Sequence, residues 1–198
     1  MILVEQTQVP DTDLPVSEFR DHLQLGSGFA DDGFQDAVLI PQLRAALSAI
    51  EGKTGKALLE REFKLVVTAW RDLGRQVLPM APVSDVTAFR ITDINDQAEL
   101  IAPSVYHLRP DTHVPVMQSL SLSLPTIPIG GTAEIEFVAG FGDWSAVPDD
   151  LKQAVFQLAT HFYESRSAVG ARAAPMPLSV ASICRRHTPV RLVGARRI

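Results

Sequence analysis

The chain has a single cysteine, Cys184, among its 198 residues. One cysteine excludes an intramolecular disulfide and any zinc site built from cysteines, so a reducing interior is the simplest compartment. Arg185 and Arg186 follow this residue and would favour its thiolate, but the sequence pairs it with no base. A small buried hydrophobic residue is the alternative interpretation.

Long hydrophobic runs are also missing. No apolar stretch approaches the roughly 20 residues of a membrane-spanning helix, so we expect no membrane partner. The N-terminal stretch MILVEQTQVPDTD has no basic region and turns acidic, so we expect no secretory signal. With 46% hydrophobic and 21% charged residues, the composition is typical of a soluble globular domain.

The sequence lacks the short motifs of common active sites. It contains no P-loop, no dinucleotide-binding glycine motif, no G-x-S-x-G, no H-E-x-x-H and no C-x-x-C. GFGDW at 140–144 leads into a predicted helix, and a turn explains it better than a phosphate site.

Histidines and carboxylates do not form a recognisable site either. No two of the 5 histidines are four residues apart, and the adjacent pairs Asp31/Asp32 and Asp149/Asp150 stand at predicted helix starts, where capping explains them. We therefore expect no enzymatic activity, no cofactor and no metal. The histidines are His22, His107, His113, His161 and His187.

What the sequence does contain is an uneven distribution of charge. Residues 1–164 hold 11 Lys and Arg against 23 Asp and Glu, a net charge of −12, whereas residues 165–198 hold 7 arginines and no acid. Such an asymmetry suggests that the tail meets an acidic partner, and a solvated terminus is the alternative. The tail arginines are Arg166, Arg172, Arg185, Arg186, Arg191, Arg196 and Arg197.

Two partners could take the arginine tail. Arginine pairs with phosphates, so a nucleic-acid-binding module is one hypothesis, but the tail lacks aromatic residues that would stack on bases. The acidic body also disfavours binding of free DNA. Docking into an acidic pocket or channel of a protein fits better, because arginine is the preferred cation at interfaces.

Two segments have a helical period. Ile40, Leu43, Leu47 and Ile50 predict an amphipathic helix near 36–54, which Gly52 and Gly55 would end and which Pro41 would kink unless it lies in the first turn. A second helix is predicted near 148–166. Its core stripe is Leu151, Ala154, Val155, Leu158, Ala159 and Phe162.

The start and the flank of the second helix carry further signals. Pro148 suits the first helical position, and Asp149 and Asp150 place negative charge at the positive end of the helix dipole. Phe156 and Tyr163 lie on a flank of the stripe. They indicate either a wider buried face or a contact between subunits.

Between the two helices the period changes to two. REFKLVVTAW, QSLSLSLP and TAEIEFVAG predict strands with one buried face, and turn signals between them imply five or six short strands over 60–140. VSEFRDHLQL predicts a short helix with Ser17 as its N-cap, and PLSVASICRRH predicts another. The fold class is therefore α+β, with an inserted antiparallel β-rich segment and an extended C-terminal tail.

The order of these parts resembles a known family. LIPQLRAALSAIEGKTGKAL at 39–58 and IEFVAGFGDWSAVPDDLKQAVFQLATHFYESR at 135–166 are similar to two motifs of tailed-phage head–tail connector (adaptor) proteins. The subgroup with a β-rich segment between its helices fits best, including adaptors of alphaproteobacterial gene transfer agents. Two positions depart from the family pattern. The chain has Gly140-Phe141-Gly142 where the family usually has Gly-Tyr-Gly, and it has Pro41 inside the first helix.

The resemblance implies a domain division and a role. It divides the chain into an N-terminal extension (1–30), a connector domain (31–166) and a basic tail (167–198). It implies a homo-oligomeric ring, typically of twelve subunits, assembled in the bacterial cytoplasm and located at the head–tail junction of a phage-like particle. The ring would join the portal protein to a stopper or tail protein, and DNA would pass through its channel without sequence-specific binding.

The same resemblance assigns candidate contacts. Phe156, Tyr163 and Arg166 become candidates for the contact between subunits, and PVRLV at 189–193 could add as a strand to a partner. The candidates for portal binding are Arg172, Arg185, Arg186, Arg191, Arg196 and Arg197.

Overall fold

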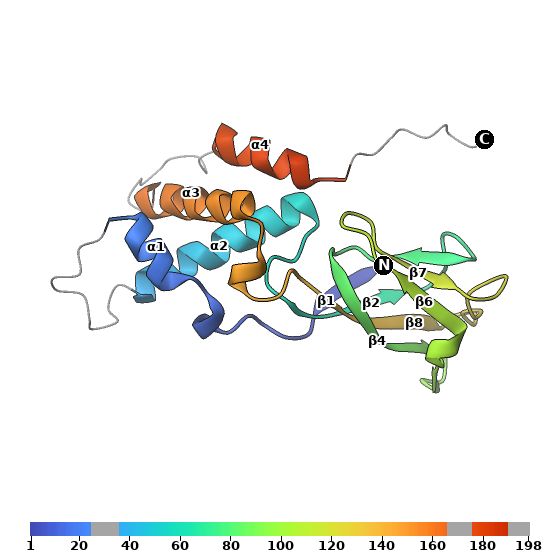
Figure 1. Ribbon diagram of the computed structural model, residues 1–198. Coiled ribbons are helices and arrows are strands. Elements are labelled where there is room, and N and C mark those ends of the chain that lie inside the picture. Colours follow the sequence, from blue (N-terminus) through green and yellow to red (C-terminus); the bar gives the residue numbers. More distant parts are fainter. Residues whose placement is uncertain (25–35, 166–175, 190–198) are drawn as a thin grey trace. The chain divides into compact units, whose positions relative to one another are not determined.

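A computed structural model describes residues 1–24, 36–165 and 176–189 of the chain. Its contacts divide the chain into two compact units, each built from two separate stretches of sequence. The β unit comprises Met1–Asp13 and Lys56–Val147, and the helical unit comprises Leu14–Gly55 and Pro148–Ile198. This mixture of helices and antiparallel sheets confirms the α+β class (Figure 1). The three-part division by sequence stays a prediction.

The helical unit contains the two long helices that the period predicted, at closely matching bounds. In it α3 packs against both α2 and α4, and α1 packs against α2. Helix α4 confirms the short helix predicted over PLSVASICRRH. The helices are α1 (Val16–His22), α2 (Asp36–Thr54), α3 (Asp149–Ser165) and α4 (Leu178–His187).

Helix α2 is amphipathic and accommodates its proline. Leu39, Leu43 and Ile50 are fully buried, whereas Pro41 is the sixth residue of the helix, past its first turn, so the helix continues through it with one backbone hydrogen bond missing. The helix ends where Gly55 adopts φ +69° and donates its N–H to the Glu51 carbonyl at 2.8 Å. Gly52, which the sequence suggested as a stop, lies within the helix.

The predicted cap of α1 is wrong by two residues. Helix α1 begins at Val16, and the carbonyl of Pro15 accepts the N–H of Phe19 at 2.9 Å. Ser17 is therefore inside the first turn rather than before it. No side chain caps this helix, whose one buried residue is Phe19.

The β unit contains two antiparallel sheets (Figure 1). One has five strands in the order β1-β2-β8-β4-β5, and the other has three in the order β3-β7-β6. The strands are β1 (Ile2–Glu5), β2 (Arg61–Val67), β3 (Arg75–Val77), β4 (Val83–Thr92), β5 (Ala98–Leu100), β6 (Tyr106–Arg109), β7 (Val116–Ser119) and β8 (Thr132–Ala139). Short 3-10 turns span Asp11–Asp13, Pro103–Val105 and Trp144–Ala146.

Strand β8 lies at the centre of the larger sheet and buries one face, as its alternation predicted. Ala133, Ile135, Phe137 and Ala139 are fully buried, while Glu134 and Glu136 face the other side. The register pairs Phe137 with Phe63 of β2, and their rings stack at 5.7 Å between centroids. Burial of one such phenylalanine stabilises the fold by about 1.5–3 kcal/mol.

The strand predicted over QSLSLSLP is wrong beyond Ser119, where β7 ends. Ser119 Oγ donates to the carbonyl of Ser123 at 2.8 Å and accepts the N–H of Ser121 at 3.1 Å. These local bonds compete with a sheet ladder and fold the segment into a turn. Leu124 is buried as predicted, but Leu122 is 101% exposed.

Strand β1 is absent from the sequence-based prediction, which placed residues 1–30 in an N-terminal extension with a short helix. Ile2, Leu3 and Val4 pair with Val66, Leu65 and Lys64 of β2. The Ile-Leu-Val run was the available signal, because residues of this kind favour strands.

Candidate functional site

The connection from β8 toward α3 is a rigid glycine turn. Gly140 has φ +143°, and a Cβ built there would lie 2.3 Å from the Cα of Glu60. Its N–H donates to the Pro82 carbonyl at 2.9 Å, and Gly142 accepts the Glu60 N–H at 2.9 Å. Only glycine fits this close approach of backbones. The turn is therefore structural, as the sequence favoured, and the described atoms show no phosphate cradle.

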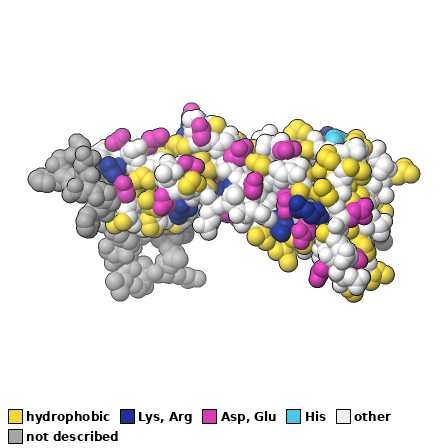
Figure 2. All heavy atoms as spheres, turned by 90° about the horizontal axis from the view of Figure 1, so that it is seen from below, with side chains coloured by type: hydrophobic (Ala, Val, Ile, Leu, Met, Phe, Trp, Pro, Cys, Tyr) yellow, Lys and Arg dark blue, Asp and Glu magenta, His cyan; other side chains and the backbone are white. Residues whose placement is uncertain are grey.

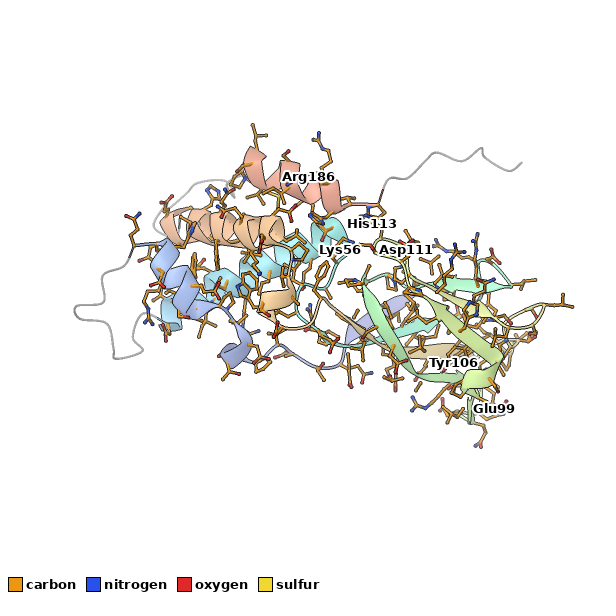
Figure 3. The ribbon with its side chains drawn as sticks, in the orientation of Figure 1. Lys56, Glu99, Tyr106, Asp111, His113 and Arg186 are labelled. Atoms are coloured by element: carbon orange, nitrogen blue, oxygen red, sulfur yellow. The ribbon has the colours of Figure 1, made fainter. Side chains whose placement is uncertain are left out.

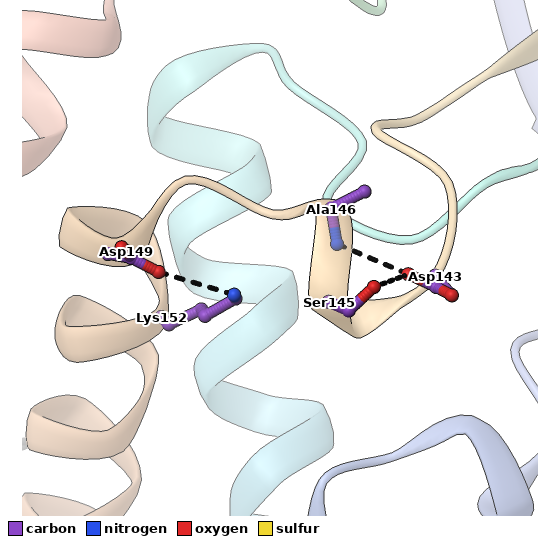
Figure 4. A network of polar contacts seen from close by, with 5 residues as sticks. All are labelled: Asp143, Ser145, Ala146, Asp149 and Lys152. Atoms are coloured by element: carbon purple, nitrogen blue, oxygen red, sulfur yellow. Dashed lines mark hydrogen bonds and ion pairs between the residues drawn. The ribbon is translucent and has the colours of Figure 1, made fainter.

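Asp143 fixes the remainder of this connection (Figure 4). Its carboxylate accepts the Ala146 N–H at 3.1 Å and the Ser145 hydroxyl at 2.6 Å, which caps the short turn at 144–146. In the next helix, Lys152 donates to Asp149 at 3.3 Å. Of these three contacts, only the bond from the Ala146 N–H holds the backbone directly, and the other two join side chains within one turn. None of the three indicates a catalytic group.

Helix α3 buries most of the stripe that its period predicted. Phe162, the last residue of that stripe, is only half-buried. The last turn of α3, toward Ser165, thus contains no fully buried residue. The buried residues are Leu151, Ala154, Val155, Leu158 and Ala159.

Phe156 lies on the flank of this stripe and contacts helix α1. Its ring stacks on Phe19 at 5.9 Å between centroids and lies 5.5 Å from the ring of His22. This contact supports the wider buried face, one of the two interpretations of the sequence. Phe156 is partly exposed, and so is Tyr163, which lies two helical turns further along α3. A contact between subunits therefore stays a prediction for both residues. Arg166 lies outside the described residues.

Helix α4 is fastened to α3 through one carboxylate. Asp150, in the first turn of α3, contacts His187 Nε2 at 2.8 Å and Arg186 Nη2 at 3.1 Å, both from the last turn of α4. At the other end, Ser179 donates to the Gln157 side chain at 2.9 Å. These polar contacts and the buried face of α4 fix the helix on α3.

The charge state of Asp150 suits this role. Burial alone would raise the pKa of its carboxyl, but the hydrogen bond and charge of His187, the Leu151 N–H and the charge of Arg186 together hold the pKa below its usual value. The carboxylate also lies at the positive end of the α3 dipole. Asp150 is therefore ionised wherever the protein is folded near neutral pH.

The arginine candidates are divided by the structure. Arg185 is exposed on α4, and Arg186 is engaged with Asp150 while 65% of its side chain stays exposed. Both belong to helix α4, which lies where the sequence predicted a short helix. The other four candidates, Arg172, Arg191, Arg196 and Arg197, lie outside the described residues, as does most of PVRLV.

Cys184 is buried on the inner face of α4 beside Val180. Burial raises the pKa of its thiol, and the charge of Lys53 opposes this effect only in part. A thiol held in this way is a poor nucleophile. The interpretation as a small buried hydrophobic residue is the one that the geometry supports.

Lys56 is the one fully buried lysine among the described residues. Its ammonium donates to the Thr112 carbonyl, and burial lowers its pKa against the opposing charge of Asp111. Asp111 accepts the N–H groups of His113 at 2.7 Å and Val114 at 2.8 Å, so its carboxylate shapes the loop (Figure 3). The adjoining small open pocket offers one ionisable side chain, Asp111. The arrangement supports a loop anchor rather than an acid–base site.

Other predicted absences can be stated only for the described residues. Within residues 1–24, 36–165 and 176–189, no three His, Cys, Asp or Glu side chains are placed to hold a metal ion. Over the same ranges, none of the helices combines the length and the apolar character that a membrane crossing requires.

A feature that the sequence interpretation missed is the apolar surface of the β unit. Figure 2 shows hydrophobic side chains at the surface of this unit. The exposed large hydrophobic residues there are Met1, Ile2, Leu3, Val4, Leu73, Val77, Ile94, Leu100, Val114, Leu120, Leu122 and Ile129. Scattered exposed aliphatic residues are common, but clustered ones mark contacts with other proteins.

Comparison with solved structures finds full-length similarity to chains of one kind of particle. A chain in the neck of an empty gene transfer agent (GTA) particle, computed with C6 symmetry, is 51% identical with a TM-score of 0.89. A chain in the virion of a native GTA particle is 50% identical with a TM-score of 0.87. A chain in the neck of a native GTA particle, computed with C12 symmetry, is 47% identical with a TM-score of 0.85. In each case 100% of both chains is covered.

Two further comparisons found nothing: no family model and no curated protein matches this chain.

Proposed function

Since the chain belongs to the head–tail adaptor family of gene transfer agent particles, we propose that it forms the ring that joins the portal to the stopper or tail. DNA passes through the channel of this ring. The observation that carries the proposal is the similarity to neck chains over the whole length of both partners. Members of this family are structural components of the virion neck.

The ring contains twelve copies of the chain. A neck computed with C12 symmetry and one computed with C6 symmetry are both compatible with twelve subunits around one axis. A cyclic arrangement requires a lateral contact that repeats between identical neighbours. The chain joins the phage-like particle at its neck after synthesis and assembly in the bacterial cytoplasm.

The tail arginines bind the portal. The part of the tail that includes Arg191, Arg196 and Arg197 follows a helix that is itself fastened to α3. A cationic segment on a fixed base can reach an acidic pocket of a neighbouring protein, and arginine retains its charge there. The body of the chain, at −12 over residues 1–164, gives no such attraction for DNA. An acidic channel wall lets DNA slide because it repels the phosphates.

The function is tested by deleting the gene in the source organism and purifying the particles. We expect DNA-filled heads without tails, and tailed particles after the wild-type gene is restored. Electron microscopy of negatively stained particles counts both classes. Tailed particles at wild-type frequency from the deletion strain would contradict the proposal.

The portal contact is tested separately with a charge-matched pair of variants. In the first, Arg191, Arg196 and Arg197 are replaced by serine; in the control, the exposed Arg71, Arg75 and Arg109 of the β unit are replaced instead. Arg186 is left intact because it supports α4. We expect only the first variant to be lost from particles while its thermal unfolding midpoint stays unchanged. Normal incorporation of the first variant, with loss of salt-dependent DNA binding, would favour a nucleic-acid module.

A further inference from the structure

The larger sheet of the β unit ends in two uncovered strands. The strand order places β1 at one edge and β5 at the other, and every residue of both strands is exposed. No strand in the described part of the chain pairs with the outer side of either one. Uncovered strands are sites at which proteins pair with other chains, and natural sequences usually protect them with charge.

The β1 edge lacks that protection, because its exposed residues are mostly apolar. Ile2 is 62% exposed, and Leu3 and Val4 are exposed as well. Because successive side chains of a strand point to opposite faces, β1 is apolar on both faces. A strand of this kind is typical of a buried position. The one charged residue of the strand, Glu5, is engaged by Arg61 at 2.8 Å.

The β5 edge has a second apolar surface beside it. Leu100 is 66% exposed on β5, Ile94 is 70% exposed in the turn between β4 and β5, and Ile129 is 98% exposed. The register pairs Thr92 with Thr132, which brings the turn after β4 next to the turn before β8. Accordingly, a Cβ at Gly130 would lie 3.1 Å from Ile94. Ile94 and the residue next to Gly130, Ile129, thus lie close together at the turn beside β5, and Leu100 lies further along the same edge, opposite Arg90.

We propose that the β1 edge of one copy packs against the β5 edge of the next copy around the ring. Subunits that meet head to tail in a ring use two different surfaces of the same molecule. The sheet supplies such a pair at its opposite edges. All five strands alternate in direction, so β1 and β5 run the same way and the sheets of neighbouring copies can follow one another.

The chemistry of both edges favours a copy of this chain over DNA. The side chains of Met1, Ile2, Leu3 and Val4 at one edge and of Ile94, Leu100 and Ile129 at the other are uncharged. The neighbouring cations Lys64 and Arg90 are already paired with Glu134 and Glu136. The acids nearby, Asp93 and Glu99, would repel the phosphates of DNA. Two apolar edges of similar extent are complementary to each other. The inference rests on the proposed ring, and it adds the surfaces on which neighbours meet.

Cysteine cross-linking in particles tests the contact. The double variant Ile2→Cys with Leu100→Cys is produced in the deletion strain, with each single variant alongside, and purified particles are treated with a short bifunctional maleimide. Cys184 stays in place because it is buried. We expect a ladder of linked copies from the double variant only. The control is Ile2→Cys with Leu122→Cys, since Leu122 is more exposed than Leu100 but lies outside both edges.

The outcomes separate the two proposals. A double variant that is present in particles yet links no more than the single variants overturns the edge contact and leaves the adaptor function standing. Wild-type chain absent from purified particles overturns the adaptor function, and the ring contact with it. In parallel, Ile2→Lys should lower incorporation about tenfold at an unchanged unfolding midpoint, whereas Ile2→Val incorporates normally. Wild-type incorporation of Ile2→Lys also overturns the edge contact.

Discussion

The two units of this chain treat their apolar residues differently. Among the described residues, the helical unit leaves two large aliphatic side chains exposed, Val38 and Leu178, whereas the β unit leaves twelve hydrophobic residues exposed. The helical unit fastens its helices with buried stripes and with polar contacts at helix ends, such as those of Asp150. The difference indicates that the β unit has the larger share of surface to be covered by other proteins.

A pair of glycine substitutions gives the largest expected difference between the units. In the β unit, Gly140→Ala drives a Cβ to within 2.3 Å of the Glu60 backbone at φ +143°, so we expect a loss of more than about 3 kcal/mol. In the helical unit, Gly52→Ala meets nothing within 4 Å and should stabilise α2 by up to about 1 kcal/mol. Urea unfolding of both variants measures the contrast, and equal effects would contradict it.

Phe156→Ala tests whether the flank of α3 belongs to the core of the helical unit. The ring of Phe156 stacks on Phe19, so its removal should lower the free energy of unfolding by about 2 kcal/mol. Denaturant unfolding of the isolated protein provides the value. Unchanged stability together with lost particle incorporation would instead assign Phe156 to the contact between subunits.

Asp150→Asn removes the carboxylate that holds α4, and we expect it to cost about 1–2 kcal/mol at neutral pH. The folded pKa of Asp150 is depressed, so its contribution is fully present above the usual carboxyl value of about 4 and is lost as pH falls through the folded pKa. The difference between wild type and variant should therefore vanish in acid. Thermal unfolding between neutral and acidic pH checks this.

Asp149→Asn is the matched control for that experiment. Asp149 shares the first turn of α3, but its side chain is 99% exposed and contacts Lys152 at 3.3 Å. An exposed pair of this kind contributes little, so the variant should unfold like the wild type near neutral pH. Equal losses from the two substitutions would show that the helix dipole, and not the α4 contact, accounts for the effect.

Leu122→Ser gives the smallest expected effect. Leu122 is fully exposed at the turn after β7, so its replacement should change the free energy of unfolding by less than about 0.5 kcal/mol. Leu124, two residues later, is buried, and Leu124→Ser should cost about 3 kcal/mol. Unfolding measurements that rank the two the other way would restore the strand that the sequence suggested.

These pairs show how far the sequence could predict the fold. The α3 stripe and the β8 alternation were readable, because one side of each element is buried and the period shows on the chain. The serine alternation at 119–123 has the same period, but hydroxyl bonds to the local backbone bend it away from the sheet. Strand β1 was missed because its residues are exposed and show no alternation.

The sequence predicts the contacts of the candidate site residues less well than it predicts the fold. The charge of the tail was evident, but the sequence could not show that Arg186 and His187 turn back to Asp150 across 36 and 37 positions of the chain. Nor could it show that Phe156 contacts Phe19, since such a contact depends on how α1 packs beside α3. The apolar edges require the strand order, which no local pattern contains.

The most direct test of the account is cryo-electron microscopy of the neck in particles purified from the source organism. We predict a ring of this chain between portal and tail, with the arginine tail in contact with the portal and β1 of each copy against β5 of its neighbour. Intact tailed particles whose neck contains no copy of this chain would contradict the central claim.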